Sequence, residues 1–503
     1  MLQQVYNGNW VKGPMKGEVE MSVHTEKSLP RKSLKELGIS ARNVIHFLEY
    51  LKAHSIELHS FMLMRQGHVA AEGWWAPYGP DLPHMLFSLS KSFTSTAIGM
   101  AVYEGKLSLD DPVVSFFPED VPEEVSPNLA AMQVKHLLMM GTGHAVDTMG
   151  ALAGAKDGNW VKSFLALPVE HEPGTVFVYN TGATYMLSAI LQKITGETLL
   201  EYLQPRLFEP LGIENPTWES CPRGINTGGF GLKVTTEDVA KFGQLYLQKG
   251  VWQGKRLVEE SWIDAATSKQ ISNGNGGDSD WAQGYGYQFW RCRHGVYRGD
   301  GAFGQFCIVL PEQEAVLAMT SGTNDMQGIL NGVWEHLLSA FSEGNGGSSE
   351  EDAAAEQELR HVLEGLVLEP PRLQADSEGE AELGSGKECV LEPNDLDLQS
   401  TKIEIQGDTA VLTVKNPRGE HRIELGRHTW RLGRTALFGG EEQIAASFTW
   451  KSPETLLLTI QRIETPFRSS IDIEWLAEGV EIRHAINVSF GETASPPIRG
   501  HEQ

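Results

Sequence analysis

The sequence predicts two domains, a large one that mixes helices with strands and a small antiparallel β domain behind it. Residues 40–342 combine helical periodicity with short β-rich runs. Residues 343–382 hold twelve acidic and two basic residues, which is typical of a charged connector. Beyond this connector the apolar residues recur with period two, as in strands that bury one face. We therefore expect domains at 1–345 and 386–503, joined by an acidic linker at 346–385 with room for a short helix.

Composition and charge exclude two classes of partner. The 503 residues carry 41 Lys and Arg against 66 Asp and Glu, a formal charge of −25. Nucleic acids and anionic membranes attract basic faces, so neither is an expected partner. The 41% hydrophobic content is ample for packed cores. The sequence thus predicts an acidic globular protein and leaves its oligomeric state open.

Several features favour a reducing, cytoplasmic location. No run approaches the roughly 20 apolar residues that span a bilayer, and residues 1–23 lack the basic and apolar regions of a secretory signal. The four cysteines lie far apart with no Cys-x-x-Cys pair, so we expect free buried thiols. The sixteen histidines lack ligand spacing, and no phosphate-binding loop is present. We expect neither a metal nor another cofactor.

The C-terminal domain is expected to be built from hairpins. Two alternating runs at 402–405 and 410–414 flank Gly407-Asp408, a dipeptide typical of tight turns. Further alternating runs lie at 455–461, 469–475 and 480–488. No catalytic constellation is visible in this part of the chain, and we expect about 110 residues of antiparallel sheet.

The segment around Ser88 is the most informative part of the chain for chemistry. Ser88 and Lys91 form a Ser-x-x-Lys motif, followed by small and apolar residues at helical spacing. Residues i and i+3 share one helix face, so the Lys91 amine is expected beside the Ser88 hydroxyl. A lysine in an apolar pocket has a lowered pKa and can accept the serine proton. The motif therefore predicts a nucleophile and its base on a buried helix that begins near Ser88.

A second segment, residues 172–190, contributes a tyrosine. Pro173-Gly174 marks a turn, residues 176–179 are expected to be extended, and a helix is predicted to begin after Asn180-Thr181-Gly182. Tyr179 lies at this junction. With a lysine nearby to lower its pKa, its phenol would relay a proton between the serine and a leaving group. The alternative is a packed aromatic beside a helix cap.

Together these segments resemble the serine β-lactamase and penicillin-binding-protein superfamily, in particular its class-C-like branch of esterases, D-aminopeptidases and amide hydrolases. The resemblance runs in order through residues 86–93, 105–113, 134–143, 172–190 and 229–262. It implies an α+β fold of the β-lactamase/transpeptidase type, in which an antiparallel sheet is flanked by helices and joined to an all-helical lobe.

The resemblance also implies roles for individual residues. It makes Ser88 the acylated nucleophile, Lys91 its general base and Tyr179 the second proton-handling group. The backbone N–H of Ser88 would supply half of an oxyanion hole. The second N–H is expected from Ala302, next to Gly301.

Two of the superfamily's short sequence motifs, called boxes, are altered in this chain. The third box usually consists of Lys or His, then Ser or Thr, then Gly, and its first position corresponds here to Arg298 or Gly299. In the middle box the usual amide position holds Thr181, while Asn180 comes one residue early. Both residues, with Arg298, are candidate substrate-binding groups. Because Arg293 and Arg298 flank the third box, the cleft is expected to be basic enough to accept a carboxylate.

These observations predict a serine hydrolase that forms an acyl-enzyme on a small ester or amide. Esterase, D-amino-acid amidase or peptidase, and β-lactamase-like activities all fit this prediction. The two altered boxes leave one alternative from another class, a catalytically silent protein that keeps the fold for binding or assembly. The identity of the substrate is not encoded in these motifs.

Overall fold

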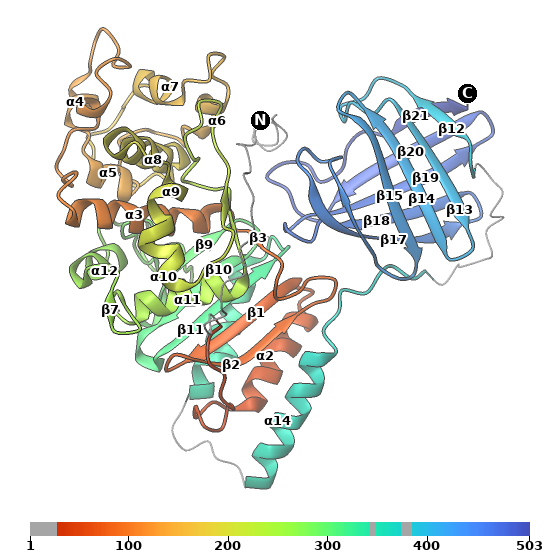
Figure 1. Ribbon diagram of the computed structural model, residues 1–503, viewed down its shortest axis with the longest axis horizontal. Helices are drawn as coiled ribbons and strands as arrows, with labels where there is room; N and C mark the ends of the chain where they lie inside the picture. Colours follow the sequence, from red (N-terminus) through yellow and green to blue (C-terminus); the bar gives the residue numbers. More distant parts are fainter. Residues whose placement is uncertain (1–27, 342–348, 374–384, 503) are drawn as a thin grey trace, which may run out of the picture. The chain divides into compact units, whose positions relative to one another are not determined.

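The structure, a computed structural model, describes residues 28–341, 349–373 and 385–502. These residues divide into two compact units (Figure 1). The larger unit holds the described residues up to Trp74 and those from Pro83 to Gly365, while Trp75–Leu82 and the residues from Leu366 onward form the smaller one. Two regions of the sequence analysis lie outside the described residues. They are residues 1–23, which lack a secretory-signal pattern, and residues 346–348 and 374–384 of the expected linker.

The larger unit is built on a six-stranded antiparallel sheet with the strand order β2-β1-β11-β10-β9-β8. The strands are β1 (Leu58–Arg65), β2 (His68–Trp74), β8 (Trp290–Arg291), β9 (Tyr297–Gly301), β10 (Gln305–Leu310) and β11 (Ala315–Ser321). The central strand β11 is buried along its whole length, whereas the edge strand β2 alternates between buried and half-buried residues. This difference follows from their positions, since only a central strand is covered on both faces.

Helices pack on this sheet and beside it. Helix α11 (Thr236–Leu247) contacts β1, β10 and β11, and α2 (Ala41–Ala53) contacts α13 (Met326–Gly332) and α14 (Ser349–Glu364). Figure 1 shows α14 running along α2. Helix α14 therefore belongs to the larger unit, and it covers the stretch where the sequence left room for a short helix. The small strands are β3 (His84–Met85), β4 (Thr217–Trp218), β5 (Leu232–Val234), β6 (Val251–Trp252) and β7 (Lys255–Arg256).

A helical lobe completes the larger unit, as the resemblance implied. Helix α8 (Thr181–Thr195) lies at its centre, because it contacts α3, α5, α6, α7 and α9. The other helices of the unit are α3 (Ser90–Tyr103), α4 (Pro127–Ala131), α5 (Val134–Leu138), α6 (Met149–Ala153), α7 (Trp160–Ala166), α9 (Leu199–Leu203), α10 (Glu209–Leu211) and α12 (Glu260–Thr267). Every residue from Ser90 to Ala101 of α3 is buried, which its run of small residues permits.

The smaller unit is a ten-stranded, barrel-like sheet, which confirms the expected β domain. Its strand order is β15-β14-β13-β12-β21-β20-β19-β18-β17-β16, and a parallel pairing of β15 with β17 brings the ends of the order together. The strands are β12 (Glu388–Leu391), β13 (Ser400–Gln406), β14 (Thr409–Asn416), β15 (Gly419–Arg427), β16 (Arg431–Thr435), β17 (Glu442–Ser452), β18 (Thr455–Gln461), β19 (Arg468–Leu476), β20 (Gly479–Ile486) and β21 (Ile498–Glu502). Gly407, with φ 59°, turns the chain between β13 and β14 at the predicted hairpin.

One segment of the N-terminal half belongs to the smaller unit. Trp75–Leu82 follows directly on β2, and its Tyr78 side chain is 7% exposed in a cluster with Ala445 and Ile463. The Tyr78 hydroxyl donates a hydrogen bond to the Thr465 carbonyl oxygen at 2.8 Å and accepts one from Gln461. The chain thus runs through the smaller unit immediately before it reaches β3 and Ser88.

The four cysteines (Cys221, Cys292, Cys307 and Cys389) are free and buried, as expected. None of the helices in the described ranges is long and apolar enough to cross a bilayer.

Candidate active site

Ser88 lies at the entry to a buried helix. It is the middle residue of a short 3-10 turn, Phe87–Leu89, that runs straight into α3. The Leu86 N–H donates to the Leu232 carbonyl oxygen at 2.9 Å, which ties this turn to β5. Ser88 is partly exposed, whereas Phe87 and Leu89 on either side are 1% and 0% exposed. Phe87 has φ 48°, an uncommon conformation for a bulky residue that is found mostly at turns and strained functional sites.

The Lys91 amine reaches the Ser88 hydroxyl, as the i, i+3 spacing predicts. Its Nζ lies 3.1 Å from Ser88 Oγ, 3.3 Å from Thr181 Oγ1 and 2.8 Å from the Gly229 carbonyl oxygen. A neutral amine has two N–H donors and one lone pair. The carbonyl of Gly229 can only accept, and Thr181 can take the second N–H. The lone pair then remains for the Ser88 proton.

Burial determines the charge of this amine. Lys91 is 1% exposed, and burial lowers its pKa to about 7, although the carboxylates of Asp147 and Asp300 act in the opposite direction. A lysine at this pKa is substantially neutral at physiological pH, so it can serve as a base. The sequence predicted the burial from the apolar character of the helix.

Tyr179 shares a hydrogen bond with the Ser88 side chain. Its ring stacks on Trp290 with centroids 5.3 Å apart, meets Tyr285 edge-on, and lies 4.9 Å from the Lys91 amine. Burial and the Asp300 carboxylate raise the pKa of Tyr179 well above its ordinary value. The expectation that a neighbouring lysine lowers this pKa is therefore wrong. The phenol stays protonated, and it can donate or relay a proton only as a neutral group.

Of the two middle-box residues, Thr181 lies in the site and Asn180 does not. Thr181 is partly exposed and its hydroxyl contacts Lys91, as described above. Asn180 is 0% exposed, and its Oδ1 accepts hydrogen bonds from the backbone N–H and hydroxyl of Thr148 and from the Ala183 N–H. Asn180 is thus the N-cap of α8. Its amide is committed to the helix start and does not line the site.

Two glycines bring β9 against the nucleophile. A Cβ atom at Gly299 would lie 2.5 Å from Ser92 Oγ, and one at Gly301 would overlap the Leu86 carbonyl oxygen. Only residues without a side chain allow the strand to approach the start of α3 this closely. Ala302 follows at the end of β9 and is partly exposed.

Arg298 lies behind the site. Its guanidinium is fully buried and donates from Nε to Asp300 Oδ2 at 2.9 Å, and from one Nη to the Asp280 carbonyl oxygen and Cys292 Sγ. It also lies 4.4 Å from the Trp281 ring centre. Because it is covered on all sides, Arg298 cannot touch a substrate in this arrangement, contrary to the substrate-binding role expected of it.

The cleft is not basic in the way the two arginines suggested. Arg293 forms an ion pair with the buried Asp280 at 2.8 Å, and Arg298 is paired with Asp300. Each guanidinium is thus neutralised by a carboxylate that sequence spacing alone did not reveal. The expectation of a locally basic cleft was wrong for this reason.

Three contributors to the site escaped the sequence reasoning. The Gly229 carbonyl, the Asp147 carboxylate and the Asp300 carboxylate all act on the Lys91 amine. A Cβ atom at Gly229 would lie 2.7 Å from Thr181 Cγ2, so this position requires a glycine. The Gly228-Gly229 pair was therefore the only feature of the sequence that pointed to a close backbone approach here. No local motif marked either aspartate.

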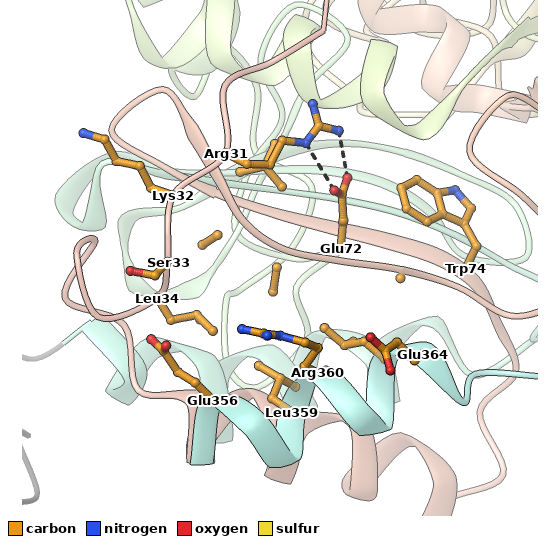
Figure 2. A pocket seen from close by; sticks show the side chains of 15 residues that line it. Arg31, Lys32, Ser33, Leu34, Glu72, Trp74, Glu356, Leu359, Arg360 and Glu364 are labelled. Atoms are coloured by element: carbon orange, nitrogen blue, oxygen red, sulfur yellow. Dashed lines mark hydrogen bonds and ion pairs between the residues drawn. The ribbon is translucent and has the colours of Figure 1, made fainter. Parts of the chain in front are cut away.

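A separate groove lies between β2 and α14, as Figure 2 shows. Its volume is about 440 Å³, and Arg31, Glu72, Trp74, Leu359 and Arg360 are among its lining residues. The Arg31 guanidinium donates two hydrogen bonds to Glu72 at 3.2 and 2.9 Å. The groove shares no lining residue with the Ser88 cluster. Nor does any group of three or more His, Cys, Asp or Glu side chains suited to a metal occur among the described residues.

Comparison with known proteins shows the family to which the chain belongs. The Beta-lactamase family profile matches residues 46–340, and the chain belongs to that family. The 6-aminohexanoate-dimer hydrolase of Paenarthrobacter ureafaciens is 26% identical over 286 residues, 53% of this chain and 73% of that protein. The lovastatin esterase of Penicillium rubens is 29% identical over 150 residues, 25% of this chain and 37% of that protein.

A solved structure shows the same fold. The putative 6-aminohexanoate-dimer hydrolase from Bacillus anthracis superposes with a TM-score of 0.52 at 20% identity, over 62% of this chain and 87% of that one.

A further sequence relative, a putative D-alanyl-D-alanine carboxypeptidase of Escherichia coli K12, is 24% identical over 141 residues, 26% of this chain and 32% of that protein. The protein is thus a member of a hydrolase family whose relatives include amide hydrolases, esterases and carboxypeptidases.

Proposed function

We propose that this protein is a serine hydrolase that forms an acyl-enzyme at Ser88 on a small ester or amide. The proposal rests above all on one observation, a lysine amine with a pKa of about 7 that lies 3.1 Å from a partly exposed serine hydroxyl. Serine is a weak nucleophile unless a base takes its proton. A buried, neutral lysine provides that base without a histidine.

The residues suggest a sequence of steps. Lys91 takes the Ser88 proton as Ser88 Oγ bonds to the substrate carbonyl carbon. The resulting oxyanion is held by the N–H groups of Ser88 and Ala302. The neutral Tyr179 phenol relays the proton to the leaving group, whose bond to the carbonyl carbon breaks. Water then attacks the acyl-serine and gives a proton to Lys91. Lys91 passes this proton to Ser88 Oγ as the bond between that oxygen and the acyl carbon breaks, which releases the acid and restores both residues.

The relatives support the bond type. Their names describe hydrolysis of a 6-aminohexanoate dimer and of the lovastatin ester, which are an amide and an ester. The two bond types require the same nucleophile, base and oxyanion donors. The silent-protein alternative would require the Ser88, Lys91 and Tyr179 contacts to persist without turnover.

Active-site labelling tests the proposal. A fluorophosphonate should bond to Ser88 with loss of fluoride, and peptide mapping should locate the adduct there. Ser88→Ala should lose the label and the hydrolysis of p-nitrophenyl butyrate. Ser90→Ala should keep the label, because Ser90 is fully buried and hydrogen-bonds to the Leu232 N–H. An unlabelled Ser88 in a folded protein without turnover would favour the silent binding protein.

A further inference from the structure

Asp300 is a buried carboxylate in the strand that lies against the nucleophile. It belongs to β9 and is 6% exposed. Its two neighbours on the strand are Gly299, which lies close to Ser92, and Gly301, which lies close to the Leu86 carbonyl group. These close approaches fix the backbone of Asp300 beside the turn that carries Ser88.

Two donors hold this carboxylate in place. Arg298 Nε donates to Asp300 Oδ2 at 2.9 Å, and the Trp290 side chain shares a second hydrogen bond with it. Both donors are buried, and Arg298 and Trp290 are paired across strands β8 and β9. The guanidinium also donates to the Asp280 carbonyl oxygen. The carboxylate therefore has a fixed position before any substrate arrives.

The groups around Asp300 keep it ionised at neutral pH. Burial raises the pKa of Asp300, whereas the Arg298 guanidinium acts in the opposite direction through its charge and its hydrogen bond. Because a guanidinium does not lose its proton, a neutral Asp300 would leave a bare buried charge. Tyr179 and Tyr285, whose pKa values are raised by burial and also by Asp300, stay neutral. Lys91 also lies within its electrostatic reach.

Lys91 needs a neighbouring charge when it acts as a base. Its amine contacts Ser88 Oγ, Thr181 Oγ1 and the Gly229 carbonyl oxygen, and all three groups are neutral. Once the amine has taken the Ser88 proton, an ammonium group belongs to a side chain that is 1% exposed. A buried charge without a counter-charge is costly. The ammonium form therefore depends on a carboxylate that does not touch it directly.

Two carboxylates act on the Lys91 amine, and they differ in exposure. Burial lowers the pKa of Lys91, while Asp147 and Asp300 both act to raise it. Asp147 is exposed, so water and salt screen its charge, whereas Asp300 is buried and is screened much less. Asp300 is therefore the better placed of the two to support a charge that forms during the reaction.

We infer that Asp300 is a positioning residue of the Ser88 site, whose fixed carboxylate stabilises the ammonium group that forms when Lys91 takes the Ser88 proton. This inference rests on the proposed function, since it concerns the base of the same reaction. The proton moves from Ser88 Oγ to Lys91 Nζ as Oγ bonds to the carbonyl carbon, and Asp300 neither gains nor loses one. A buried aspartate supports the imidazolium of a Ser-His-Asp triad in the same way.

The titration of Lys91 tests this inference without turnover. In a Ser88→Ala protein with isotope-labelled lysine, the NMR signal of Lys91 Cε should titrate at about pH 7, and its loss in Lys91→Met assigns it. Asp300→Asn keeps an oxygen that accepts from Arg298 but removes the charge, so it should lower this midpoint by roughly one pH unit. With Ser88 present, the rise of kcat/KM for p-nitrophenyl butyrate should move to lower pH by a similar amount. Its plateau should fall by up to about tenfold, because the ammonium form is less stable.

Asp280→Asn is the matched control. Asp280 is likewise a buried carboxylate paired with an arginine, since Arg293 lies 2.8 Å away, and the substitution leaves its backbone carbonyl in place. Asp280 is not one of the two carboxylates that act on Lys91, so the Lys91 midpoint should stay close to that of the Ser88→Ala protein. An unchanged midpoint in Asp300→Asn overturns the inference. Equal shifts in both variants also overturn it, because any buried ion pair of this region would then have the same effect.

A double variant keeps the test decisive if Asp300→Asn does not fold. Arg298→Met combined with Asp300→Asn removes both charges, and replacing a whole buried pair is commonly tolerated. The Lys91 midpoint should again fall, because Asp300 and not Arg298 is among the charges that act on Lys91. A wild type that takes no label at Ser88 and hydrolyses no ester contradicts the proposed function and this role together. Hydrolysis with an unshifted midpoint refutes the role of Asp300 alone.

Discussion

Replacing Lys91 by methionine tests both effects of its burial, on catalysis and on stability. Lys91 has an ordinary pKa of 10.5 and a folded-state pKa of about 7. This difference corresponds to about 5 kcal/mol of destabilisation when the group is charged. The value is an upper bound, because local rearrangement reduces the cost of a buried charge. Methionine has a similar length and no charge, so it removes the penalty together with the base.

The sign of the pH dependence follows from proton binding. Between pH 7 and 10.5 the unfolded chain keeps its proton on Lys91 while the folded protein releases it. The free energy of unfolding of the wild type therefore rises with pH across this window, by about 1.4 kcal/mol per pH unit from this group. The penalty is fully present below pH 7. Relative to the wild type, Lys91→Met should be most stabilised at low pH and should lose about 2 kcal/mol of that advantage between pH 7 and 9, since the folded protein is only half deprotonated at pH 7.

Denaturant unfolding of both proteins at several pH values gives this difference directly, since other titrating groups cancel. Lys91→Met should also lose hydrolysis, and kcat/KM of the wild type should rise with an apparent pKa near 7. Ser88→Ala is the control, because it should lose activity but keep the wild-type pH dependence of stability. A stability difference that does not change between pH 7 and 9 would refute the reasoning, and Lys91 would then be a charged structural lysine.

Three further substitutions test separate parts of the structure. Tyr179→Phe keeps the ring stacking but removes the phenol, so kcat/KM should fall by about 10²-fold to 10⁴-fold in a steady-state assay with unchanged stability. Gly299→Ala inserts a methyl group between β9 and α3, and should cost about 1–3 kcal/mol of unfolding free energy and reduce activity. Tyr78→Phe removes two buried hydrogen bonds of the smaller unit, and should lower its unfolding free energy by about 1–3 kcal/mol.

Each of these has an outcome that contradicts it. Full activity in Tyr179→Phe would remove the phenol from the proton relay. A Gly299→Ala protein with wild-type stability would mean that β9 is free to move away from α3. If Tyr78→Phe unfolds at the same denaturant concentration as the wild type, the hydroxyl contributes nothing to the smaller unit. Gly433→Ala is a control for the glycine test, because its nearest neighbour would be an ordinary 3.9 Å contact.

Local features of the fold were readable from the chain. The Gly407-Asp408 turn and the alternating runs beside it form the predicted hairpin of β13 and β14, paired antiparallel. The helix predicted to begin after Gly182 begins two residues earlier, at Thr181, because the Asn180 side chain caps it. The pairing of Ser88 with Lys91 belongs here too, because residues three apart on a helix are neighbours whatever surrounds them.

The path of the chain between the two units could not be predicted from the sequence. Nothing in the composition of Trp75–Leu82 distinguishes it from an ordinary loop, yet Tyr78 is buried with residues nearly four hundred positions away. The boundary at Leu366 likewise falls inside the range 346–385 expected as a linker, because α14 packs on α2. Only long-range packing determines such assignments.

For the site, the sequence by itself determined which residue types stand at catalytic spacing on one helix. The tertiary structure decided what those residues can do. Thr181 and Gly229 accept hydrogen bonds from the Lys91 amine across 90 and 138 positions of the chain. Asp300 forms an ion pair with Arg298, whereas Asp147 accepts hydrogen bonds from the backbone N–H groups of Met149 and Thr181. Spacing along a helix is a local geometric property, whereas desolvation and charge pairing depend on atoms that only the folded chain brings together.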